Sequence, residues 1–311
     1  MNLTEAILLT IIASSTPFVL AGIGELVVER SGVLNLGVEG MMIMGTISGF
    51  AVAYMSGSAT LGFVAAVLAG MIFSSLFAFM TLTLGANQVA SGLALTILGL
   101  GLSDLLGTTF VGLNRQKIPS LDIPGLSDLP IVGPLLFGQN ALVYLSIVLV
   151  AVVWWFLYRS RGGLILRAVG ESHVSAHALG YPVRLIRLAA VLFGGGCAGL
   201  AGAYLSLADT PFWGTGMTAG RGWIALALVV FASWRPWRLL FGAYLFGAIW
   251  IGNLHMQALG GSLPHWLVWP TQFWTALPYL ATVIVLVMIS SRKDRSGAAP
   301  ASLGVPFVPD K

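Results

Sequence analysis

The chain has 311 residues, of which 57% are hydrophobic and only 8% are charged. An average soluble domain carries roughly 25% charged residues, so a water-soluble fold could not cover its surface with so few, whereas a bilayer requires an apolar exterior. The formal net charge is +4, but no basic stripe with interleaved aromatic residues is present, which argues against nucleic-acid binding. The single cysteine, Cys197, excludes an internal disulfide and a four-cysteine metal site.

Long apolar segments predict an all-α fold, a polytopic transmembrane helical bundle, because a spanning helix needs about 20 mostly apolar residues. We expect about 8–10 spans, including broken or re-entrant helices. The segment at 222–234 is short for a full span, and such a segment is tolerated only where protein buries it. Gly195, Gly199 and Ala203 lie four apart and give one span a small-residue face. The predicted spans are 5–27, 41–56, 59–84, 92–113, 140–158, 186–207, 222–234, 239–257 and 273–290.

Lysine and arginine positions predict the orientation, because cytoplasmic loops are enriched in both. Basic residues cluster in the 159–187 loop, at Arg235 and Arg238, and in the tail. Placing all three clusters in the cytoplasm puts the N-terminus and the Pro-rich 114–139 loop outside. We expect one transmembrane domain over 1–291, whose first span is retained rather than cleaved as a signal peptide. The tail over 292–311 is predicted to be cytoplasmic and disordered.

The stretch from Arg30 to Thr46 carries polar residues among apolar ones. Two glycines flank Glu39, and Asn35 is placed one helical turn before it. Polar side chains are costly in a membrane and usually face a partner or a water-filled path, while the glycines weaken the helix and allow a break. Two interpretations stay open: Asn35 and Glu39 line a translocation path, or they form a buried, hydrogen-bonded joint between helices.

Polar residues also follow the third predicted span. Asn87 and Gln88 lie between two spans, where they form either part of a translocation path or a plain polar turn, which is the norm for loops. Asp104 lies deeper, within the fourth predicted span. There it would pair with a neighbouring helix or line the path.

The 161–182 stretch is the most informative segment. Ser172 is placed to cap a short helix, and Gly180 and Pro182 are placed to end it. The long loop therefore presents a short helix along the membrane surface, flanked by arginines. Such an element suits a cleft in a soluble partner, and attachment to anionic membrane lipid is the alternative.

Motifs for nucleotide and metal chemistry are missing from the sequence. A phosphate-binding P-loop needs a lysine followed by Ser or Thr, and none of the three lysines has such a neighbour. His173 and His177 lie four apart, but no third ligand accompanies them, and zinc takes three or four protein ligands. We therefore expect no metal site, no cofactor and no enzymatic activity in this chain.

Taken together, these stretches resemble the permease subunits of bacterial ABC importers in the branched-chain amino acid, simple sugar and nucleoside group. The run from Ser31 to Met42 and the segment from Asn87 to Leu95 resemble the nucleoside or simple-sugar versions. The 159–187 loop resembles the family's ATPase-coupling loop, although the family commonly has Asn-Pro where this chain has Ser172-His173. The residues that match the coupling loop are Arg167, Gly170, Glu171, Ala176 and Gly180.

The resemblance implies a multi-subunit transporter in a bacterial inner (plasma) membrane, with residues 1–291 as a permease domain. Two permease subunits, identical or different, would form the pore in the lipid. A cytoplasmic ABC ATPase would bind ATP and magnesium. A periplasmic or lipoprotein substrate-binding protein would deliver the solute, for which a nucleoside or purine is the first expectation and a simple sugar the second. Closure of the ATPase would move residues 171–180 and rock the helices between two states. The alternative is an ion-coupled secondary transporter that uses Glu39 and Asp104.

Overall fold

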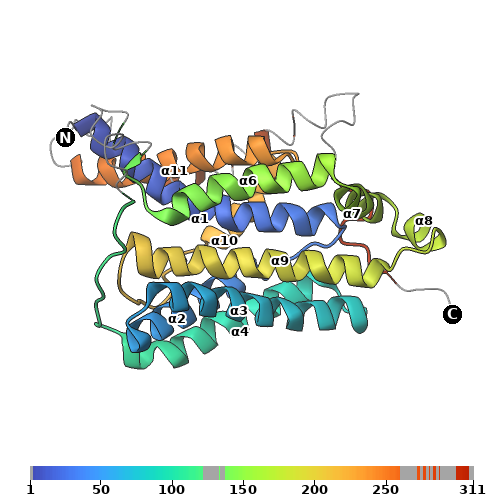
Figure 1. The fold of residues 1–311 in the computed structure, drawn as a ribbon, viewed down its shortest axis with the longest axis horizontal. Coiled ribbons are helices and arrows are strands. Elements are labelled where there is room, and N and C mark those ends of the chain that lie inside the picture. Colours follow the sequence, from blue (N-terminus) through green and yellow to red (C-terminus); the bar gives the residue numbers. More distant parts are fainter. Residues whose placement is uncertain are drawn as a thin grey trace.

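A computed structural model describes residues 3–121, 137–259 and 299–307, together with Gly133 and scattered positions between 272 and 287. In these residues, helices lie side by side along one axis and form an elongated bundle (Figure 1). Six of the helices are long and apolar enough to cross a membrane, which confirms the predicted polytopic bundle. The last predicted span, 273–290, lies largely outside the described residues.

The elements of the described chain are helices, several of which end in a short turn of different pitch. They are α1 (Leu3–Arg30), α2 (Val38–Ser56), α3 (Ala59–Ala78), the π-helical η1 (Phe79–Thr83), α4 (Gln88–Gly107), the 3-10 turn η2 (Thr108–Phe110), α6 (Ala141–Arg159), α7 (Arg161–Glu171), α8 (His173–Ala178), α9 (Val183–Tyr204), the π-helical η3 (Leu205–Asp209), α10 (Arg221–Phe231) and α11 (Pro236–Leu259).

Helix α9 occupies the middle of the bundle, between α1 and α6 on one side and α2, α3 and α4 on the other (Figure 1). Small residues allow this close approach. A Cβ added to Gly199 would lie 2.1 Å from the carbonyl oxygen of Ala66 in α3, and one added to Gly45 of α2 would lie 2.4 Å from the Cα of Gly199. Lipid gives no hydrophobic drive for helices to associate, so tight backbone packing of this kind supplies the attraction. The predicted small-residue face of this span is confirmed.

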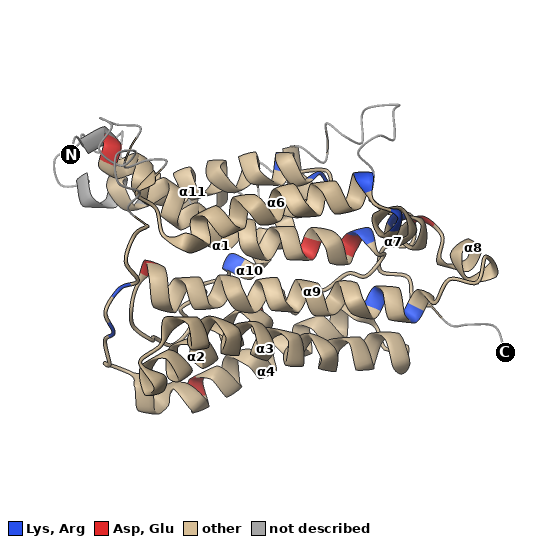
Figure 2. Ribbon diagram, viewed as in Figure 1, with Lys and Arg blue, Asp and Glu red and all other residues tan. Residues whose placement is uncertain are grey.

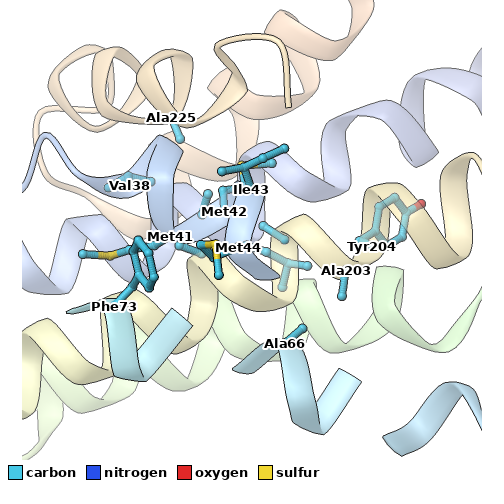
Figure 3. Close-up of a cluster of buried hydrophobic side chains, with 14 of the residues drawn as sticks. Val38, Met41, Met42, Ile43, Met44, Ala66, Phe73, Ala203, Tyr204 and Ala225 are labelled. Atoms are coloured by element: carbon cyan, nitrogen blue, oxygen red, sulfur yellow. The ribbon is translucent and has the colours of Figure 1, made fainter. Parts of the chain in front are cut away.

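A methionine-rich core fills the space where α2 crosses α9 and α3. Met41 and Met42 are fully buried and Met44 nearly so; Phe73 of α3 lies beside Met41, while Ala203 and Tyr204 of α9 lie farther along the same cluster (Figure 3). The unbranched thioether side chain adapts to irregular gaps. These residues therefore hold α2 against both neighbours.

Two segments interrupt the helices inside the bundle. Residues 31–37 between α1 and α2 are not helical, so Asn35 does not lie one helical turn before Glu39, and that expectation was wrong. The reason is local: Gly32 has a φ of +87°, a backbone conformation that favours glycine, and the chain leaves the helix there. The short helix predicted at 222–234 is confirmed as α10, whose 11 residues cannot span a bilayer alone.

The two ends of the bundle differ in charge. Basic residues gather at the end that carries α7 and α8, while only scattered charged residues lie within the bundle (Figure 2). We call this end the basic end. Arg167, Arg235 and Arg238 line one cavity there, and the described tail lies against α7. The 159–187 cluster and the Arg235–Arg238 cluster thus share one end, as the orientation analysis required, while the basic residues of the tail lie outside the described residues. Helix α1 begins at the other end (Figure 1).

Candidate functional site

The non-helical segment 31–37 is held by side chains from α1 and α4. The Leu34 amide donates to Gln88 Oε1 at 2.8 Å, and the Asn35 amide donates to Glu25 Oε1 at 3.3 Å. The Thr96 hydroxyl donates to the Leu36 carbonyl at 3.1 Å. Because no water is present in a bilayer core, irregular backbone survives there only when protein groups satisfy it. Glu25 and Gln88 therefore act as substitutes for the missing helical hydrogen bonds.

Glu39, in the first turn of α2, connects the non-helical segment 31–37 to the start of α10. Its Oε1 accepts from the Thr218 hydroxyl at 2.5 Å and from the Gly220 amide at 2.9 Å, and its Oε2 accepts from the Gly222 amide at 2.7 Å. These amides form the start of α10, where the helix dipole and unpaired N–H groups favour a carboxylate. A Cβ on Gly222 would lie 2.7 Å from the Glu39 backbone, so α10 begins directly against the first turn of α2.

The predicted path residues fall into two groups. Asn35, Glu39 and Gln88 are buried and hydrogen-bonded within the bundle. For Asn35 and Glu39 such a joint is one of the two interpretations that the sequence left open, whereas Gln88 is not part of a plain polar turn. Asn87 is exposed and caps α4 by accepting from the Ala90 amide at 3.0 Å. Asp104 is exposed on the outer face of α4, so the structure does not bring it to the other four residues.

Two buried carboxyl groups of α1 escaped the sequence reasoning. Glu25 and Glu29 are each only 1% exposed. Glu29 Oε2 accepts from the indole N–H of Trp234, while the Arg30 guanidinium donates to the Trp234 carbonyl at 2.9 and 3.2 Å. The signal was present in the sequence, since two acidic residues four apart near the end of a span share one helix face. Glu29 and Arg30 fix the α10–α11 turn to the end of α1, whereas Glu25 holds the α1–α2 linker through the Asn35 amide.

Helices α7 and α8 cross the basic end and carry the predicted coupling residues. α7 lies across the axis of the spans (Figure 1). Serines begin both helices: Ser160 accepts from the Gly163 amide at 3.0 Å, and Ser172 accepts from the Ser175 amide at 3.2 Å. Gly180, with a φ of +86°, forms the turn that follows α8. The predicted cap and stop are confirmed, but the loop forms two helices where the sequence analysis described one.

Two glycines fix α7 to the spans beneath it. A Cβ on Gly163 would lie 1.9 Å from the Phe156 carbonyl of α6, and one on Gly170 would lie 2.2 Å from the Arg30 carbonyl of α1. Ala176 of α8 is buried in a small cluster with Val169 and Val183. Force applied to this helix pair is therefore transmitted by direct backbone contact to α1 and α6.

A C-terminal strap, residues 299–307, lies over the end of α7. The Ser302 amide donates to the Gly170 carbonyl at 2.9 Å, and the Gly304 amide donates to the Gly32 carbonyl at 3.3 Å. The Ser302 hydroxyl and the Ala301 amide donate to the Glu171 carbonyl and carboxylate at 3.2 and 3.4 Å. The prediction of a disordered tail was therefore wrong for these residues, because backbone hydrogen bonds hold them to α7 and to the α1–α2 linker.

Arg187 of α9 connects the strap to the linker and to α8. Its side chain is fully buried and donates to the Ser31 carbonyl at 3.2 Å and to the Val305 carbonyl at 3.1 Å. Its Nη2 lies 3.4 Å from His173 Nδ1. Burial, and then the nearby Arg187 charge, lower the pKa of His173 below its ordinary value. A neutral imidazole therefore accepts readily from this arginine.

The two loop histidines have a packing role. The rings of His173 and His177 lie 5.4 and 5.3 Å from the Phe307 ring, both edge to face. Edge-to-face contacts of this kind add modestly to the burial of an aromatic ring. The i, i+4 spacing that would suit a metal site thus places Phe307 of the strap against α8.

Comparison with known proteins adds an independent line of evidence. Residues 7–289 match the family described as branched-chain amino acid transport system, permease component. The chain is 44% identical to the putative glucose ABC transporter permease protein TsgC13 of Haloferax volcanii, over 92% of each chain. It is 32% identical to the nucleoside ABC transporter permease protein NupC of Lactococcus lactis, over 100% of this chain and 99% of the relative. It is 31% identical to the guanosine ABC transporter permease protein NupQ of Bacillus subtilis, over 96% of this chain and 94% of the relative.

Proposed function

This chain belongs to the branched-chain amino acid transport system permease family, and from that membership we propose how it is coupled to its partners and what it carries. It is the membrane permease subunit of an ABC transporter. We infer that the basic end faces the cytoplasm of a bacterial inner (plasma) membrane, because cytoplasmic loops are enriched in Lys and Arg. The C-terminus and the strap then lie in the cytoplasm as well.

The observation that carries the proposal is the pair α7–α8. The pair crosses the basic end and is fixed to α1 and α6 at Gly170 and Gly163. Its outer surface carries exposed apolar residues, with Val174 65% and Leu179 77% exposed. Exposed apolar residues rimmed by polar ones mark surfaces that protein partners cover. We propose that a separate cytoplasmic ABC ATPase, which binds ATP and magnesium, docks here.

The strap belongs to the same assembly. It bridges Gly170 of α7 and Gly32 of the α1–α2 linker. A movement of α7 driven by the ATPase would therefore reach the linker both through α1 and through the strap. The linker leads directly to Glu39, which holds the start of α10. This continuous set of contacts provides a route from the ATPase to the two broken helices.

A second permease subunit, identical or different, is proposed to cover the outer face of α4. Asp104 is exposed on that face, with Ile97 and Leu105 also exposed by 72% and 69%. A carboxyl group inside a span is costly when it faces lipid and usually faces a partner or a water-filled path. The pore would then form between the two subunits, beside α4.

The proposed solute is a small polar molecule. Relatives of this chain are named for nucleosides, guanosine and glucose, and a ribose or hexose ring is common to these solutes. A nucleoside or purine remains the first choice and a simple sugar the next. An external substrate-binding protein, periplasmic or lipid-anchored, would deliver it, so the ligand of that protein would identify the solute.

The docking assignment is tested by Leu179→Asp, with Val111→Asp as its matched control. Val111 is 57% exposed and lies outside the long helices at the end opposite α8. The partner ATPase is co-expressed with the tagged full-length chain, and the amount that co-purifies is measured. We expect Leu179→Asp to lower recovery at least about tenfold, the size of an interface hot-spot loss, and Val111→Asp to leave it unchanged. Equal recovery with both variants would refute docking at α8.

A further inference from the structure

Four arginines surround one cavity at the basic end, away from the exposed tip of α8. The cavity has a volume of about 570 Å³. Among the described residues that line it, none is acidic. Guanidinium groups repel one another across such a short span, so their convergence from separate parts of the chain indicates a site for an anion. The lining consists of Arg30, Trp154, Tyr158, Arg167, Arg235, Pro236, Trp237 and Arg238.

The cavity contains donors that remain available. The Arg167 guanidinium stacks over the Tyr158 ring at 5.0 Å, and its buried Nε has no hydrogen-bond partner within the described residues. Arg238 is exposed in the first turn of α11. The first N–H groups of a helix have no intrahelical acceptor and carry a partial positive charge. Side-chain and main-chain donors therefore point to the same class of ligand, a phosphate or phosphodiester.

Apolar surface continues from the cavity toward the middle of the bundle. Arg238, Phe241 and Leu245 lie on one face of α11, since they are three and four residues apart, and Phe241 is 75% exposed while Leu245 is 48% exposed. On α6, Trp154 and Ile147 are seven residues apart, about two helical turns, and therefore lie on one face, with Ile147 37% exposed. Charges thus lie at the end of the bundle and apolar residues lie deeper. A free phosphate ion needs only the charges, whereas an amphiphile needs both.

We propose that this cavity binds the phosphate headgroup of an anionic phospholipid, with its acyl chains along the exposed faces of α6 and α11. Guanidinium groups suit this role because their planar donors match phosphate oxygens in pairs. Trp154 and Trp237 suit the depth of the headgroup, where tryptophan is enriched in membrane proteins. The bound lipid would connect α7 to the start of α11. This proposal requires only that the bundle lies in a bilayer and does not depend on the identity of the solute.

Native mass spectrometry of the full-length chain in detergent provides the test. The chain is incubated with equal amounts of phosphatidylglycerol and phosphatidylcholine. The number of molecules of each lipid that stay bound after transfer of the protein to the gas phase is then counted. We expect phosphatidylglycerol to be retained preferentially. Arg235→Gln with Arg238→Gln should lower that retention at least about tenfold, because each basic residue near a headgroup adds to binding. The control pair Arg161→Gln with Arg184→Gln removes two exposed arginines from the same end but outside the cavity, and should retain the lipid.

Two further competition experiments show whether the bound phosphate group belongs to a lipid or to another ligand. Glycerol phosphate has the headgroup chemistry without acyl chains, and we expect it to compete at least about a hundredfold more weakly than the lipid, since every buried CH₂ adds to affinity. Competition at equal concentration would show a site for a soluble phosphate. Displacement of the lipid by the partner ATPase would show that an acidic protein surface occupies the cavity. Either result, or equal retention by both arginine pairs, would overturn the proposal.

Discussion

The buried joint around Glu39 and the contacts of α7 and the strap at the basic end both connect separate helices. They use polar groups in opposite ways. At the joint, Glu39 is 3% exposed and receives three hydrogen bonds from Thr218, Gly220 and Gly222. At the basic end, the Glu171 carboxylate accepts from the Ala301 amide but stays exposed, and Arg167 is partly exposed with an unpaired Nε. The difference shows that polar residues in the interior complete the backbone, whereas those at the end can serve partners.

The physical reason lies in the surroundings. An unpaired backbone group costs several kcal/mol in hydrocarbon, so interior polar side chains are fully used by the chain itself. At the membrane surface, water satisfies a free donor at little cost until a ligand replaces it. The following predictions test this division, and they run from the largest expected effect to the smallest.

Gly199→Val should break the interior most severely. Its Cβ would lie 2.1 Å from the Ala66 carbonyl, so α3 and α9 must separate and the interior polar contacts beside them lose their alignment. We expect the free energy of unfolding, measured in mixed detergent micelles, to fall by at least about 3 kcal/mol, as for other overpacked or disrupted cores.

Gly101→Ala is the matched control for that variant. Gly101 also lies in a span, but nothing surrounds its added Cβ within 4 Å. Alanine lowers the backbone entropy cost in a helix, so stability should rise by roughly 0.5–1 kcal/mol. A similar fall in the free energy of unfolding with both variants would show that the number of glycines in the spans, rather than close contact between helices, governs stability.

Glu39→Ala should be the next most harmful change. It leaves the Thr218 hydroxyl and the Gly220 and Gly222 amides without their acceptor, and each buried unsatisfied donor costs roughly 1–3 kcal/mol. Allowing for partial relaxation, we expect about 3–5 kcal/mol lower stability in the same unfolding assay. Glu39→Gln keeps one side-chain acceptor and should cost less. If Glu39→Ala unfolds normally and only transport is lost, Glu39 acts on the solute path and the joint interpretation is incorrect.

Removal of the strap should affect coupling more than stability. Truncation before Ala299 deletes the hydrogen bonds to Gly170 and Gly32 but leaves the spans intact. In proteoliposomes with the partner subunits, we expect solute uptake per ATP hydrolysed to fall about fivefold, a coupling change of roughly 1 kcal/mol. Truncation after Phe307 preserves every strap contact named above and should transport normally. Equal transport by both truncated chains would exclude a coupling role for the strap.

Much of the fold was predictable because membrane helices obey local rules. The apolar spans, the short α10, the small-residue face at Gly199 and the cap at Ser172 all follow from composition and spacing within a few residues of the chain. The loop proposed to couple to the ATPase was also recognisable by its resemblance to the family's loop, because its turn residues and arginines form a continuous stretch. Its division into α7 and α8 at Ser172 was missed, since one serine ends a helix and begins the next.

The polar residues were harder to place, because their partners are distant in the sequence. Glu39 and Thr218 are separated by 179 residues and Leu34 and Gln88 by 54. No spacing rule connects such pairs. The strap was missed for a related reason: its sequence has the Pro, Gly and Ala content of a flexible tail, while its order comes from contacts with distant residues, among them Gly32, Gly170 and Arg187.

The sequence by itself determined that this chain crosses a membrane many times, which loops are basic and which residues begin and end the helices at the membrane surface. These properties depend on hydrophobicity and on local backbone preferences, both of which act over one or two helical turns. Only the tertiary structure decided that Glu39 closes a joint, that residues 299–307 form a strap and that four arginines share one cavity. Those outcomes depend on contacts between distant segments, and such contacts exist only after the spans have packed.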